Sequence, residues 1–124
     1  AKYDLVIVDT PALLTSDLDQ VLKAAQLVLL PVRESIHSLR GALSVMKVTS
    51  APCKALPFFS KSNSELSTLI SAELDLLDAE ISIADEVLVA EAKTVSVLTD
   101  AKNSEVAQQY REAAYSLLEE LAIF

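Results

Sequence analysis

A run of four aliphatic residues, Leu5 to Val8, is followed directly by Asp9, Thr10 and Pro11. A run without polar alternation is typical of a strand buried on both faces, as in a parallel sheet covered by helices. Pro11 is expected to end the strand, because proline continues neither a central strand nor a helix. Open α/β sheets bind ligands at the carboxyl ends of their strands, so Asp9 is a candidate to hold Mg²⁺ beside a phosphate. An aspartate that starts a turn or caps a helix is the alternative interpretation.

Aliphatic runs and segments of helical periodicity alternate along the rest of the chain. Strands are expected at residues 27–32, 55–59 and 80–83, and helices at residues 16–25, 35–49, 64–77 and 104–119. A loop or helical turn is expected at 85–92 and a brief strand at 94–97. Strands that alternate with helices predict a parallel sheet with right-handed crossovers. We therefore expect a single α/β domain over residues 1–124, with a sheet that is part of a larger one.

The two halves of the chain differ in charge. Residues 1–63 carry seven Lys and Arg against five Asp and Glu, a balance of +2, whereas residues 64–124 carry three against thirteen, a balance of −10. An acidic second half repels nucleic acid and anionic lipid, so any DNA contact must come from a local patch or a larger assembly. No apolar run approaches the ~20 residues of a membrane-spanning helix, and we expect no membrane partner.

Three residue types that occur once in the sequence exclude several kinds of site. Gly41 is the only glycine, so the sequence contains no glycine-rich loop through which backbone amides approach phosphate oxygens. Cys53 is the only cysteine, which excludes a disulfide within the chain and favours a reducing cytoplasm. His37 is the only histidine and has no Cys or paired carboxylate at ligand spacing, so no zinc site is expected.

Short motifs are spread over most of the chain in a fixed order. The first ones are Tyr3-Asp4, four aliphatic residues and Asp9-Thr10-Pro11, then Ala24-Ala25-x-Leu27-Val28-Leu29-Leu30-Pro31-Val32 and Leu39-x-Gly41. The later ones are Ile83-x-x-x-x-Leu88-x-x-Glu91-Ala92, Val97-x-x-Asp100, Ser104 and Ala107-Gln108-Gln109-Tyr110-Arg111-Glu112. This series resembles the carboxy-terminal half or so of the ParA/MinD superfamily of deviant-Walker ATPases. The resemblance implies a P-loop NTPase-like, three-layer α/β/α fold that is incomplete at its N-terminus.

The resemblance also implies roles for individual residues. Asp9 resembles the Walker-B-like aspartate near Mg²⁺ and the attacking water, and Thr10 and Pro11 would lie in the segment that responds to the γ-phosphate. Glu91 is a candidate for contact with nucleotide or a dimer partner, or else a solvated helix residue. The residues near the adenine would be Ser60, Lys61 and Asp85. The family usually has Asn or Thr followed by Arg, and Pro followed by a basic or polar residue, where this chain has Ser60-Lys61 and Ala84-Asp85.

The function implied by the resemblance is ATP-dependent dimerisation that positions or partitions plasmid DNA, chromosomal DNA or another cargo in the bacterial cytoplasm, at the nucleoid. The cofactors would be ATP and Mg²⁺. The partners would be a second copy, a ParB-like or other activating protein, and non-specific DNA bound by the dimer. Because Ala1 enters at a mid-domain strand without a start methionine, an upstream portion with the phosphate loop is expected. The chain as given is expected to be inactive and to bind nucleotide only weakly.

Two other interpretations remain open. The chain could be a non-catalytic interaction or dimerisation module, related to ParA but without a phosphate loop, that associates through an exposed sheet edge and apolar helix faces. It could also be a relative that acts in polysaccharide synthesis or pilus placement. The stretch Asp9-Thr10-Pro11 also resembles bacterial tyrosine kinases, but their tails are rich in tyrosine and this chain ends in Leu-Ala-Ile-Phe.

Overall fold

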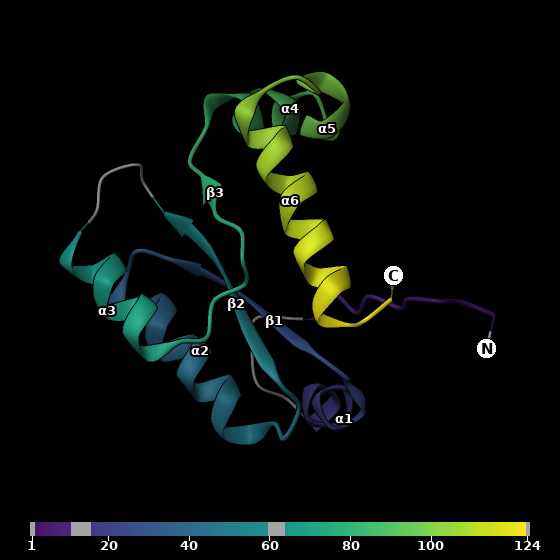
Figure 1. Cartoon of the computed structure of the whole chain (residues 1–124), viewed down its shortest axis with the longest axis vertical. Coiled ribbons are helices and arrows are strands. Elements are labelled where there is room, and N and C mark those ends of the chain that lie inside the picture. The colour runs from purple at the N-terminus through teal and green to yellow at the C-terminus, as the bar shows by residue number, and fades with distance from the viewer. Residues whose placement is uncertain (1, 11–15, 60–63, 124) are drawn as a thin grey trace.

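A computed structural model describes residues 2–10, 16–59 and 64–123. The strands form a parallel sheet in the order β1 (Val28–Arg33), β2 (Cys53–Phe59) and β3 (Ile81–Ser82). The helices are α1 (Ser16–Ala24), α2 (Ile36–Val48), α3 (Glu65–Glu73), α4 (Asp85–Ala92), α5 (Val97–Asp100) and α6 (Glu105–Glu120). Figure 1 shows α2 and α3 on one side of the sheet and α4 and α5 at the far end of α6. The expected α/β class with a parallel sheet is confirmed.

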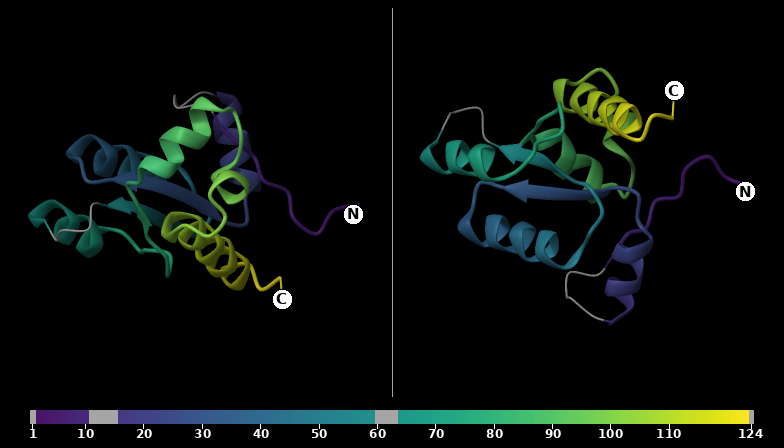
Figure 2. Two further views of the ribbon diagram at one scale, coloured as in Figure 1. Left: turned by 90° about the horizontal axis from the view of Figure 1, so that it is seen from above. Right: turned by 60° about the horizontal axis from the view of Figure 1, so that its bottom comes forward.

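Helices cover both faces of the sheet, as the right-hand view of Figure 2 shows for α2 and α6. One core lies between the sheet and the helices α2 and α3, and it contains Leu30, Val32, Leu39, Ala42, Ala55, Phe59, Ile70 and Leu74. The other core lies under α6 and contains Leu56, Leu77, Ile81, Val106 and Ala113. Neighbouring residues of β2 enter opposite cores because successive side chains of a strand point to opposite faces.

β2 pairs with the chain that follows α3 at two separate places, first with residues 75–77 and then with β3. The Ala55 N–H donates to the carbonyl of Asp75 over 2.8 Å, and the Leu77 N–H donates to the carbonyl of Ala55 over 2.8 Å. Pro57 follows at the next position on this side of β2, where proline has no N–H to donate, and pairing resumes only at β3. Because residues 75–77 pair with β2, α3 ends at Glu73 and not near residue 77 as expected.

The expected buried strand at Leu5 to Val8 is wrong for this chain. Residues 2–10 form no strand, and Val6, Ile7 and Val8 are 72%, 77% and 55% exposed. The segment runs as a tail away from the body of the molecule (Figure 1). A strand needs a neighbour for its backbone groups, and within the described residues the sheet ends at β1 on one side and at β3 on the other.

The expected strand at residues 94–97 is also wrong, because this segment ends one helix and begins the next. Thr94 has a φ of 57°, and its N–H donates to the carbonyl of Glu91 over 3.0 Å. The Val95 N–H donates to the carbonyl of Ala90 over 3.1 Å. These two hydrogen bonds are those of a Schellman motif, which normally places glycine where this chain has Thr94. Residues 85–92, expected as a loop or a helical turn, form the complete helix α4.

Candidate functional site

A group of polar residues at the carboxyl edge of the sheet joins the end of β1 to the start of α3. Ser64 Oγ donates a hydrogen bond of 2.6 Å to Oε2 of Glu34, the residue that follows β1. Ser64 and Ser67 form a reciprocal capping box, in which each backbone N–H donates to the other hydroxyl over 3.0 Å. The Glu34 carboxylate therefore fixes the N-terminus of α3 at the edge where ligands of open α/β sheets bind.

A glutamine on α6 forms two hydrogen bonds with Ser82 on the outer edge of β3. The Ser82 N–H donates to Oε1 of Gln109 over 2.8 Å, and Nε2 of Gln109 donates to the Ser82 hydroxyl over 2.8 Å. The partners in these contacts are 27 residues apart, and Glu34 and Ser64 are 30 apart. Sequence reasoning missed both pairs, because no local pattern signals hydrogen bonds over such separations.

The structure describes four of the predicted site residues, and all four are exposed. Asp9 and Thr10 are exposed in the extended segment, and Asp85 and Glu91 are exposed in the first and last turns of α4. The three carboxylates make no hydrogen bond or ion pair with any residue that the structure describes, and no group of three His, Cys, Asp or Glu among those residues could hold a metal ion. The predicted residues outside the described part of the chain are Pro11, Ser60 and Lys61. The roles of all these residues stay predictions.

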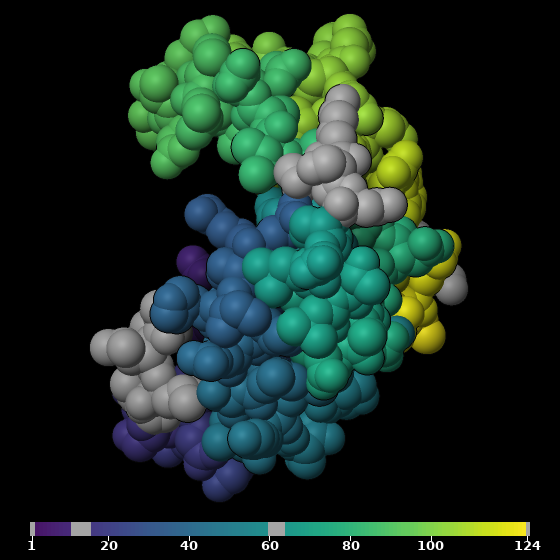
Figure 3. Space-filling view, turned by 90° about the vertical axis from the view of Figure 1, so that its left-hand side faces the viewer, coloured from purple at the N-terminus to yellow at the C-terminus, as the bar shows by residue number. Residues whose placement is uncertain are grey.

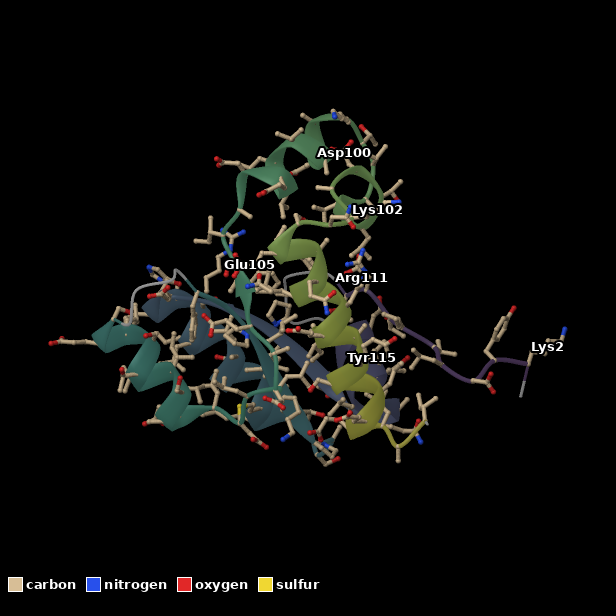
Figure 4. All side chains as sticks on the ribbon, turned by 45° about the horizontal axis from the view of Figure 1, so that its top comes forward. Lys2, Asp100, Lys102, Glu105, Arg111 and Tyr115 are labelled. Carbon is tan, nitrogen blue, oxygen red and sulfur yellow. The ribbon has the colours of Figure 1, made fainter. Side chains whose placement is uncertain are left out.

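Two of the three cations in the second half of the chain are already engaged. Lys93 Nζ lies 3.1 Å from Asp100 Oδ1, and Arg111 Nη2 donates to the carbonyl of Lys102 over 2.7 Å. Figure 4 shows Arg111 on the side of α6 that faces the turn bearing Lys102. The ammonium of Lys102 has no partner among the described residues. Only Lys93 is therefore neutralised by a carboxylate, and a DNA-binding patch in this half would rest on two cations, Lys102 and Arg111.

A second polar cluster, which the sequence analysis did not identify, ties β2 to α6. Lys54 Nζ lies 2.9 Å from Asp75 Oδ2 and 3.5 Å from Glu120 Oε1, with 20% of the lysine side chain exposed. The hydrogen bond to Asp75 is the main cause that raises the pKa of Lys54, desolvation opposes it, and attraction to both carboxylates adds to it. A raised lysine pKa stabilises the fold below the ordinary pKa, and this contribution is lost as pH rises through the folded-state pKa.

Comparison of the chain with models of protein families, with curated proteins and with solved structures yields no match. Within the described ranges, no helix combines the length and the apolar character that crossing a bilayer requires. The resemblance to ParA-type ATPases therefore rests on the ordered motifs of the sequence alone. The structure shows an α/β fold, a parallel sheet with flanking helices.

Proposed function

We propose that this chain is the carboxy-terminal part of a ParA-like ATPase domain, whose phosphate loop is supplied by residues outside the printed sequence. Several of its motifs coincide with elements of the parallel α/β fold, since the aliphatic block ending at Val32 forms most of β1 and the motif at 107–112 lies in α6. The observation that carries the proposal is that the strand β1, on its outer edge, and the exposed aliphatic run 5–8 both lack a paired strand within the described residues. An additional strand between them would pair with both.

The outer edge of β1 can accept only a short neighbour. The Val28 N–H donates to the carbonyl of Pro52 over 2.9 Å, so alternate residues from Val28 bond to β2, and Leu29, Pro31 and Arg33 face outward. Pro31 has no N–H, and the Arg33 N–H already donates to a hydroxyl of α2 over 3.0 Å. The backbone groups of Leu29 and the carbonyl of Pro31 are left to form hydrogen bonds with an added strand. That strand would lie along the first half of β1.

In the proposed domain, Asp9 would lie beside Mg²⁺ and the attacking water, since carboxylate oxygen is a preferred ligand of this ion. Thr10 and Pro11 would respond to the γ-phosphate, and Ser60, Lys61 and Asp85 would lie near the base. Phosphoryl transfer of this kind depends on positioning and on charge stabilisation. ATP binding would drive dimerisation, with Glu91 near the nucleotide or the dimer partner, and a second protein would stimulate hydrolysis. DNA or another cargo would then bind the dimer in the bacterial cytoplasm.

ATP turnover by the protein as its gene encodes it tests the proposal. We expect turnover that requires Mg²⁺, and we expect Asp9→Asn to lower kcat by roughly 100-fold, because a group that positions the metal and water would be lost. Asp4→Asn removes the same charge from the same segment and should leave kcat unchanged. The chain of the printed sequence alone should show no turnover. The proposal is wrong if the encoded protein does not hydrolyse ATP or if Asp9→Asn retains full activity.

A non-catalytic interaction module is the second candidate, and the exposed run 5–8 favours it. An aliphatic segment without a neighbour is a ready site for pairing with another chain. This candidate predicts that the encoded protein forms a stable dimer without binding ATP, and that Val6→Lys or Ile7→Lys dissociates it in size-exclusion chromatography with light scattering. A monomer that binds ATP would exclude it.

A further inference from the structure

Helix α4 presents an apolar surface on two opposite sides. Ala90 is buried, with 1% exposure, and Val87 packs against the core under α6. A rotation of about 100° per residue places Leu88, Val89 and Ala92 on the side away from Ala90 and Val87. Leu88 and Val89 are 63% and 48% exposed. A surface helix normally carries polar residues on its outer side, so an apolar outer face indicates that something else covers it.

Further exposed aliphatic residues precede and follow this face. Ile83 is 78% exposed, and its spacing from Leu88 is that of a hydrophobic staple at a helix start. Val95 and Leu98, in the turn after α4 and in α5, are 46% and 41% exposed. The space-filling view in Figure 3 shows the region of α4 and α5 standing out from the rest of the molecule, above a hollow. The outer face of α4 is therefore open to an approaching partner.

Carboxylates border the apolar face of α4. By helical spacing, Glu86 and Glu91 flank the strip of Leu88 and Val89 on its two sides, and Asp85 lies at its N-terminal end. All three carboxylates are exposed and make no ion pair within the described residues. Lys93, directly after α4, forms an ion pair with Asp100, so the face is apolar at its centre and negative at its rim.

We propose that the outer face of α4, defined by Leu88, Val89 and Ala92 with the rim of Asp85, Glu86 and Glu91, binds a basic amphipathic helix of a partner protein. Aliphatic residues of the partner would cover Leu88 and Val89, as in helix-in-groove recognition, and flanking Lys or Arg would meet the carboxylates. A second copy docked through the same face would bring the acidic rims of both copies together, and an anionic bilayer would be repelled as well. Asp85 and Glu91 also belong to the proposed nucleotide and dimer contacts, so only the apolar centre of the surface, Leu88 and Val89, is independent of the proposed ATPase function.

Titration of the encoded protein with a fluorescent model peptide tests this surface. The probe is a helix of about 18 Leu and Lys residues in amphipathic order, and its counterpart carries Glu in place of Lys. Fluorescence anisotropy should show binding of the lysine peptide only, and the affinity should fall as salt is raised. Leu88→Gln with Val89→Gln should weaken binding by about tenfold or more, because it removes the apolar centre of the contact. Glu86→Gln with Glu91→Gln should weaken it several-fold at low salt.

Matched variants separate this face from the overall negative charge. Leu69→Gln changes an aliphatic residue of α3 that is 43% exposed, and Glu73→Gln with Asp78→Asn removes two exposed carboxylates elsewhere. Both should bind the peptide like the wild type, and circular dichroism should confirm that every variant is folded. Absence of binding, equal effects in these control variants, or binding of the glutamate peptide would overturn the proposal. A dimer that Leu88→Gln dissociates would overturn it too, because a second copy would then cover the face.

Discussion

The aliphatic runs at residues 5–8 and 28–32 have nearly the same composition but opposite environments. In the second run, Leu30 and Val32 are 8% and 0% exposed, whereas Val6 and Ile7 in the first are 72% and 77% exposed. The second run pairs with β2 and packs under α2 and α3. The first run has neither a paired strand nor a covering helix among the described residues. An aliphatic run is thus buried only where the chain also supplies its neighbour, and an exposed run marks a place for a partner.

The same charge placed in each run should give the largest contrast. Val32→Asp would bury an unpaired carboxylate and should lower the free energy of unfolding by about 4 kcal/mol or more. Val6→Asp should change it by less than about 0.5 kcal/mol, because that side chain already faces water. Urea unfolding of the two variants measures the difference. Equal destabilisation would show that the first run is buried too.

The next largest effect concerns α3, one of the two helices that cover the run 28–32. Ser64→Ala removes the cap of α3 and the hydrogen bond to Glu34, and it should lower the free energy of unfolding by about 2 kcal/mol. The helix α3 supplies Ile70 to the core that contains Val32, so loosening α3 should also expose that run. Ser71→Ala removes a serine hydroxyl that donates only to the Ser67 carbonyl within α3 itself; it is the control and should stay within about 0.5 kcal/mol of the wild type.

A smaller effect, of opposite sign, is expected in the less covered region around α4. Thr94→Gly relieves a β-branched residue from a positive φ of 57° and should stabilise the protein by about 1 kcal/mol in thermal unfolding. Gly41→Ala should stabilise it by a similar amount, because Gly41 lies inside α2 and a Cβ there meets nothing within 4 Å. Destabilisation by Thr94→Gly would show that Thr94 does not hold this conformation in solution.

Thiol reactivity perturbs the protein least and reports directly on how accessible a side chain is to solvent. Cys53, at the start of β2, is half-buried, and burial raises the pKa of its thiol. A higher pKa leaves less thiolate near pH 8, so Cys53 should react slowly with a disulfide reagent. Val6→Cys in a Cys53→Ser background should react about tenfold faster. Similar rates for the two thiols would contradict the contrast between the covered and uncovered segments.

Local signals in the sequence predicted most of the fold. Helical periodicity located α1, α2, α3 and α6, and the runs around Leu30 and Leu56 located β1 and β2. Local signals could not decide whether the run 5–8 is a buried strand, because burial of this run depends on a neighbouring strand and not on its own residues. The turn at Thr94 carried no glycine, so nothing in the sequence indicated a positive φ there.

The candidate site was less accessible to sequence reasoning than the fold. Asp9 was identified from its place after an aliphatic run, and its role depends on the same missing neighbour. The start of a helix near residue 64 was predicted, but the contact of Ser64 with Glu34 was not, because the two residues meet only when β1 and β2 align. The apolar outer face of α4 escaped notice because residues 85–92 were expected as a loop or a single turn.

Amide hydrogen exchange of the chain with the printed sequence, at a concentration where light scattering shows a monomer, tests most directly whether the run 5–8 lacks its neighbour. The account predicts that the amides of Val6 and Ile7 exchange at the rate of an unstructured peptide, while those of Leu30 and Val32 exchange only through global unfolding. Protection of Val6 and Ile7 comparable to that of Val32 would contradict it, because the first run would then already be a paired strand of this chain.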